Sequence, residues 1–191
     1  MAWLIAGLVL FLGAHSVQIV APGWRAGMIA QRGEGAWKGI YTLVALIGLA
    51  LICYGYGQTR GAEPLFAPVP GLRHLTFTLV WIAFICLTAA NWPANHIKTA
   101  LRDPMVFGTG LWALGHLLVR ATPGALALFG AFLVWAVADF ISLRRRDPSA
   151  KPTPAAPKAI NTVLVVITGT VVGAIFAHVL HVMLIGVSPM P

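Results

Sequence analysis

The chain has 191 residues, of which 59% are hydrophobic and only 9% are charged, against roughly 25% charged in ordinary globular domains. So few charges cannot cover the surface of a water-soluble fold. The net charge of +8 does not indicate a nucleic-acid partner, because the basic residues interrupt apolar runs and form no basic stripe with interleaved aromatic residues. We therefore predict an integral membrane protein whose partner is the lipid bilayer.

Runs of about 17 to 25 apolar residues are typical of membrane-spanning helices. We predict an all-α, polytopic transmembrane helical bundle of about six spans, in chain order Ala2–Ala21, Trp37–Gly57, Leu72–Asn91, Pro104–Val119, Pro123–Leu143 and Asn161–Val187. The fourth run is short, so five spans is the main alternative. The whole chain, residues 1–191, is interpreted as a single transmembrane domain.

The distribution of basic residues predicts the orientation of the bundle. Of the thirteen Lys and Arg residues, only Arg60, Arg73 and Arg120 lie in or beside the loops on one side, and the other ten lie on the opposite side. The positive-inside rule then places both termini outside. The first run has no basic region before it and no cleavage pattern, so we expect it to stay in the membrane.

Residues 144–160 combine a basic cluster with four prolines. This composition favours extended conformations over a packed core, so it predicts a flexible cytoplasmic loop. Its basic cluster is interpreted as a positive-inside signal that contacts anionic lipid head groups.

Polar side chains inside the predicted spans are costly, and each is a candidate functional residue. They include Asp139 and four histidines: His15, His116, His178 and His181. Imidazole is a good ligand for haem iron, copper or zinc. The alternative is a neutral histidine that forms hydrogen bonds between helices. His74 and His96 lie at span ends and are interpreted as hydrated interfacial residues.

Helix geometry limits how these histidines could hold one haem. His178 and His181 are three residues apart and share one helical face, so they cannot be ligands on opposite sides of a porphyrin. One candidate pair joins His116 to His178 or His181, all in the outer half of the membrane. The other pair, His15 with His116, is offset in depth by roughly 12 Å at 1.5 Å per residue.

The remaining residues of note favour packing over chemistry. No pair of carboxylates lies within the spans, which argues against intramembrane proteases, ion-driven pumps and metal-dependent hydrolases. Cys53 and Cys86 are expected to differ in depth by about 16 Å, too far for a disulfide. Gly169 and Gly173 form a GxxxG pattern, which predicts close helix packing.

Three segments of the chain resemble the NnrU family of bacterial membrane proteins: Leu10–Arg25, Gly33–Gly57 and Asn95–Arg120. The most specific features are the His15–Ser16 pair and the sequence LWALGHLL around His116. This resemblance covers essentially the whole chain. It implies a multi-pass protein of the bacterial inner membrane that is associated with denitrification, through nitric oxide reduction or its regulation.

The NnrU family is in turn similar to 15-cis-zeta-carotene isomerase, a membrane enzyme that carries haem b. The isomerase's haem ligands correspond to His15 and His116, so the resemblance implies these two as the metal ligands. The isomerase also has a cysteine three residues before its second ligand, where this chain has Ala113, so ligand switching by that cysteine is not expected. Other members and membrane methyltransferases have Arg-His-Pro where this chain has Arg102, Asp103 and Pro104, which weakens a methyltransferase interpretation.

Together these patterns predict an NnrU-type protein that binds haem b among its helices and supports nitric oxide or denitrification metabolism. The candidate cofactor-binding residues are His15, His116, His178 and His181. If the protein is an enzyme, we expect haem-dependent, isomerase-like or redox chemistry. Two alternatives remain: a non-enzymatic assembly or regulatory partner of a respiratory membrane complex, and a methyltransferase-like remnant.

Overall fold

The computed structural model describes residues 1–67, 71–146 and 155–189. Within these ranges every regular element is a helix, which confirms the predicted all-α class. The elements in chain order are α1 (Ala2–Val20), α2 (Pro22–Gly57), α3 (Leu72–Asn91), α4 (His96–Leu101), α5 (Pro104–Val119), α6 (Pro123–Arg145), α7 (Ala159–Ile175), the π-helical turn η2 (Phe176–Leu180) and α8 (His181–Ile185).

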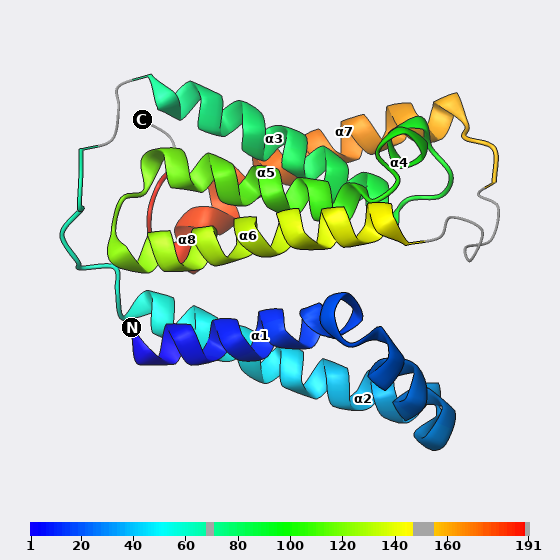
Figure 1. Cartoon of the computed structure of the whole chain (residues 1–191). Coiled ribbons are helices and arrows are strands. Elements are labelled where there is room, and N and C mark those ends of the chain that lie inside the picture. The colour runs from blue at the N-terminus through cyan, green and yellow to red at the C-terminus, as the bar shows by residue number, and fades with distance from the viewer. Residues whose placement is uncertain (68–70, 147–154, 190–191) are drawn as a thin grey trace.

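Five helical stretches are long and apolar enough to cross a membrane: α1, α2, α3, α6 and the continuous stretch from α7 through α8. α5 is shorter, at 16 residues, yet it packs between α3 and α6 as a full member of the bundle. Successive long helices run antiparallel, so α1 begins at the same end of the molecule at which α8 lies (Figure 1). Six antiparallel helices thus bring both ends of the described chain to one side.

The bundle is held together by close contacts at glycines. A Cβ added to Gly169 would lie 2.7 Å from Cα of Ile85, and one added to Gly173 would lie 3.3 Å from the side chain of Phe84. The predicted GxxxG face of α7 therefore packs directly on α3. Because η2 and α8 follow α7 without a break, this contact also positions them relative to α3.

We expect Gly169→Ala to destabilise the fold, because a methyl group has no room against the α3 backbone. The cost should be about 1 to 3 kcal/mol, as for other overpacked interiors. Thermal unfolding in detergent measures it. Gly130→Ala on α6 is the matched control, because nothing lies within 4 Å of the added Cβ. Equal unfolding temperatures for the two variants would contradict this view of the α3–α7 contact.

α2 differs from the predicted second span, because it begins at Pro22 and not at Trp37. Gly33 has φ 82° and ψ 157°, which breaks the helix into two parts. A search for apolar runs does not detect the first part because it contains polar residues. Pro22 fits the first helical position, where its missing N–H is not needed.

The predicted loop 144–160 is wrong at its edges. α6 continues to Arg145 and α7 begins at Ala159. Arg144 donates to the carbonyl of Leu101 at 2.7 Å, and Arg146 lies 3.6 Å from Asp139, so these contacts extend the helix into the basic cluster. Residues 147–154 of the predicted loop lie outside the described residues.

The orientation with both termini outside is a prediction that cysteine labelling tests. Cys53 and Cys86 are both free, as predicted, so both can be replaced by alanine to give a cysteine-free background. We expect Gly61→Cys to react with a membrane-impermeant maleimide in intact spheroplasts of a bacterial host, and Ala156→Cys to react only after lysis. The reverse pattern would overturn the orientation.

Candidate functional site

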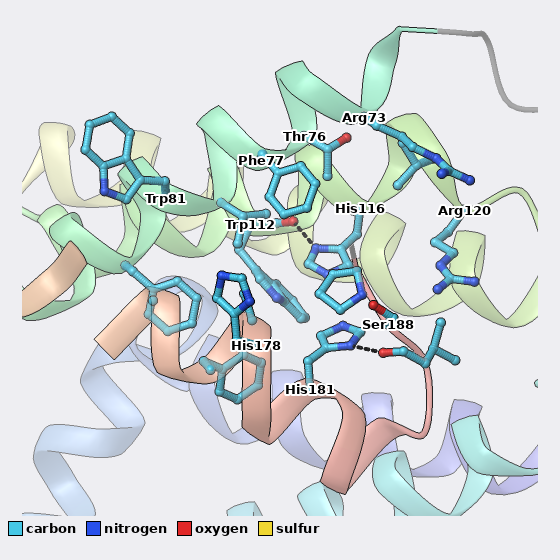
Figure 2. Close-up of a pocket in the computed structure, with 18 of the residues that line it drawn as sticks. Arg73, Thr76, Phe77, Trp81, Trp112, His116, Arg120, His178, His181 and Ser188 are labelled. Carbon is cyan, nitrogen blue, oxygen red and sulfur yellow. Dashed lines mark hydrogen bonds between the residues drawn. The ribbon is translucent and has the colours of Figure 1, made fainter. Parts of the chain in front are cut away.

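A cavity of about 550 Å³ lies between α3, α5 and the segment formed by the end of α7, η2 and α8. Its size falls within the roughly 300 to 1,000 Å³ usual for small-molecule and cofactor sites. The close-up in Figure 2 shows three histidines around this space, one from α5 and two from the opposite wall. The cavity therefore brings together residues that are far apart in the sequence.

His116 is held in a fixed orientation on α5. Its Nδ1 lies 2.8 Å from the carbonyl oxygen of Trp112, and its ring stacks on Phe129 at 4.5 Å between centroids, with 19° between the planes. A carbonyl can only accept a hydrogen bond, so in neutral His116 the proton sits on Nδ1. The lone pair of Nε2 is then free to bind a metal, and such backbone contacts are typical of metal-binding histidines.

His181 shows the same pattern on the opposite wall. Its Nδ1 donates to the carbonyl of Val187 at 2.6 Å. Gly186 makes this contact possible, because its φ of 72° turns the chain back toward the helix that it follows. Arg60 donates to the carbonyl of Ile185 at 2.6 Å, which ties the end of α8 to the connection after α2.

His178 lies on η2 and lines the same cavity. A π-helical turn is wider than an α-helical turn, and such turns are frequent at functional sites. The prediction that His178 and His181 approach from one side is confirmed, because both line the cavity from the same continuous segment. Unlike His181, His178 is exposed, so the cavity is open beside it.

His15 lies outside this cavity, between α1, α2 and α6. Its Nδ1 donates to the carbonyl of Phe11 at 2.7 Å, and its ring lies 5.2 Å from Tyr41 and 5.9 Å from Trp135. The structure therefore brings His116, His178 and His181 together and places His15 among a different set of aromatic rings.

Aromatic side chains form part of the cavity wall. One polar contact crosses the cavity at the end far from the chain ends, where Nε1 of Trp81 donates to the hydroxyl of Thr170 at 2.9 Å. This contact joins α3 to α7 and satisfies an indole N–H at membrane depth. Five aromatic residues line the space: Phe77, Trp81, Phe84, Trp112 and Phe176.

Two arginines line the other end of the cavity. Arg73 lies in the first turn of α3, and Arg120 follows α5, where extended backbone ends the helix. In the described part of the chain, no hydrogen bond or ion pair joins either guanidinium to another residue. The sequence pattern identifies both only as outer-side charges. A signal was present in the sequence, since the predicted outer side carries just three basic residues. The third, Arg60, donates to the carbonyl of Ile185 at the same end of the bundle.

The other polar candidates lie away from the cavity. Asp139 pairs with Arg146, His74 is exposed at the start of α3, and His96 lies 3.0 Å from the hydroxyl of Thr162. Across the described ranges, no three His, Cys, Asp or Glu side chains are placed to hold a metal ion together.

Comparison with known proteins agrees with this architecture. The family model described as NnrU protein matches residues 3–189. No curated protein and no solved structure matches the chain. Because the family match covers nearly the whole chain, this membrane-type helical bundle belongs to the NnrU family.

Proposed function

We propose that the protein binds haem b in the cavity between α3, α5 and η2–α8, with His116 as an iron ligand and His178 or His181 on the opposite side. The observation that carries this proposal is the pair of fixed imidazoles. His116 and His181 each hold Nδ1 on a backbone carbonyl, which leaves each Nε2 available within one aromatic cavity.

The lining fits the chemistry of this cofactor. Haem b is a planar apolar macrocycle with a central iron and two carboxylates at one edge. The aromatic wall matches the macrocycle, the histidines match the iron, and the cavity volume suits a cofactor. Since the porphyrin supplies four nitrogen ligands, one or two histidines are enough to complete the coordination.

This proposal uses His116 with a partner from the opposite wall, one of the two pairings that the sequence leaves open. The similarity to the isomerase favours His15 with His116. The depth offset between them agrees with the separate surroundings of His15, where Phe11 and Tyr41 flank the ring. The family motif is then consistent with a packing role for His15 at the α1–α2–α6 contact.

We further propose that the protein acts in nitric oxide or denitrification metabolism in a bacterial inner membrane. When bound, haem would supply one-electron chemistry, and it would take a diatomic ligand only where His178 or His181 gave up its coordination position. The chain positions the cofactor through His116, excludes water with its aromatic wall and leaves the side near His178 open. A small apolar gas could reach that opening from the lipid phase.

Reconstitution with haemin tests cofactor binding. We expect the purified protein in lipid nanodiscs to bind haemin stoichiometrically, with a Soret band shifted to that of a histidine-ligated haem. Addition of nitric oxide to the reduced form should shift the band again. A well-folded protein that gives only the spectrum of haemin in empty nanodiscs would contradict the proposal and favour a non-haem assembly partner.

A further inference from the structure

We infer that Arg73 and Arg120 bind the two carboxylates of the porphyrin and so fix which edge of the ring faces the end of the bundle. This inference rests on the proposed haem site but concerns different residues and a different part of the ligand. It makes the cavity selective for a planar apolar dicarboxylate.

Neither guanidinium at this end of the cavity takes part in an ion pair in the described part of the protein. In the described residues the ion pairs are Lys38 with Glu34 and Arg146 with Asp139. Neither pair involves an arginine that lines the cavity. Arg73 is exposed and Arg120 is partly buried, and both border an apolar space. Two guanidinium groups beside such a space favour an anionic ligand, because a guanidinium forms paired hydrogen bonds with a carboxylate.

The cavity also has a polarity gradient that matches an amphipathic ligand. The α3 residues that line it run from Arg73 to Phe84, which is roughly 16 Å at 1.5 Å per residue. The arginine end lies with the helix termini, and Trp81 lies at the opposite end of the cavity (Figure 2). A ligand with carboxylates at one edge and an apolar body can satisfy both ends at once.

Local structure explains why both arginines line one end of the cavity. Gly71, with a φ of 86°, precedes α3 and places Arg73 in its first turn. Arg120 leaves α5 with its N–H still bonded to the carbonyl of His116 at 2.9 Å. Arg120 is therefore one helical turn from His116, the proposed iron ligand. This spacing suits a porphyrin, because its iron and its carboxylates belong to one molecule and must be bound at the same time.

Protoporphyrin IX without iron tests the inference separately from histidine ligation. We expect the wild type in lipid nanodiscs to bind this dicarboxylic acid about tenfold or more tightly than its dimethyl ester, as measured by porphyrin fluorescence anisotropy. The double variant Arg73→Gln/Arg120→Gln should bind the acid and the ester equally. Arg73→Lys/Arg120→Lys should recover part of the preference, since it keeps the charge but loses the fork geometry.

The controls separate carboxylate recognition from attraction to the membrane. Arg32→Gln removes an exposed arginine outside the cavity lining, and it should keep the preference for the acid. Equal binding of acid and ester by the wild type, or binding no stronger than to empty nanodiscs, would overturn the inference. If the double variant keeps the full preference for the acid over the ester, the inference is also overturned. That result would indicate that the two arginines bind only lipid phosphates.

The haem proposal and this inference can fail independently. If haemin shows no histidine-ligated spectrum but the acid preference depends on the arginines, the iron site fails and the carboxylate site stands. If haemin is ligated but the ester of haemin binds equally well, the iron site stands and the carboxylate site fails.

Discussion

His116→Ala is expected to remove one of the two proposed histidine ligands and so to change the Soret spectrum of the haem-loaded protein. The substitution removes the imidazole whose Nδ1 is fixed by Trp112 and whose ring stacks on Phe129. Loss of an outer-shell partner alone costs about 10- to 100-fold in metal affinity, so loss of the ligand itself should weaken haemin binding by more than roughly 100-fold. Haemin titration followed at the Soret band measures the effect.

A chemical rescue separates ligand loss from misfolding. Free imidazole should restore a histidine-like spectrum in His116→Ala, because the deletion leaves space beside an intact cavity. His74→Ala is the matched control, since His74 is exposed and lies outside the lining. His15→Ala should also keep the spectrum. If His15→Ala instead loses the band while His178→Ala and His181→Ala both keep it, the pairing implied by the isomerase is correct and the proposed one is wrong.

Ala177→Trp is expected to block cofactor binding without removing any proposed ligand. Ala177 lies on η2 in the cavity wall, next in sequence to His178. An indole in its place would occupy space that a porphyrin needs. We expect haemin and protoporphyrin IX both to bind about tenfold more weakly or worse.

Val179→Trp gives the matched control on the same π-helical turn. Val179 is 48% exposed and does not line the cavity, so its substitution should leave binding unchanged. Thermal unfolding of both variants checks that the fold is kept. Full haemin binding by Ala177→Trp would show that the cofactor lies elsewhere in the bundle.

The helical architecture was predictable because the length of each apolar run can be counted directly in the sequence. The predicted spans Leu72–Asn91 and Pro104–Val119 coincide with α3 and α5. The early start of α2 and the short helix α4 were not predicted. α4 contains His96 and Lys98, and its first turn is capped by Asn95, which accepts from the N–H of Lys98 at 2.8 Å. Such a short helix is stabilised by capping and by tertiary contacts. A search for apolar runs does not detect either of these.

The site was predictable only in part. The depth of a residue in the membrane can be estimated by counting residues along its span, but the sequence does not show which helices are adjacent. Counting places His116 at a depth similar to His178 and His181, and the structure brings these three together. Counting does not show which helices are adjacent, so it could not place His15 against α2 and α6. The π-helical turn was not predictable either, because Phe176–Leu180 has no residue that forces it.

The two cavity arginines illustrate how a rule for topology can also indicate function. Basic residues are disfavoured on the outer side of a membrane protein, so the three on the predicted outer side need a local reason. Arg60 binds the carbonyl at the end of α8, and Arg73 and Arg120 line the cavity. The exceptions to the charge asymmetry therefore gather at the candidate site.

An iron-edge anomalous map from crystals of the haem-loaded protein tests the central claim most directly. The account predicts a single iron peak between α5 and η2–α8, at bonding distance from Nε2 of His116, with the porphyrin carboxylates toward Arg73 and Arg120. An iron peak beside His15, or fully loaded crystals with no peak in this cavity, would contradict it.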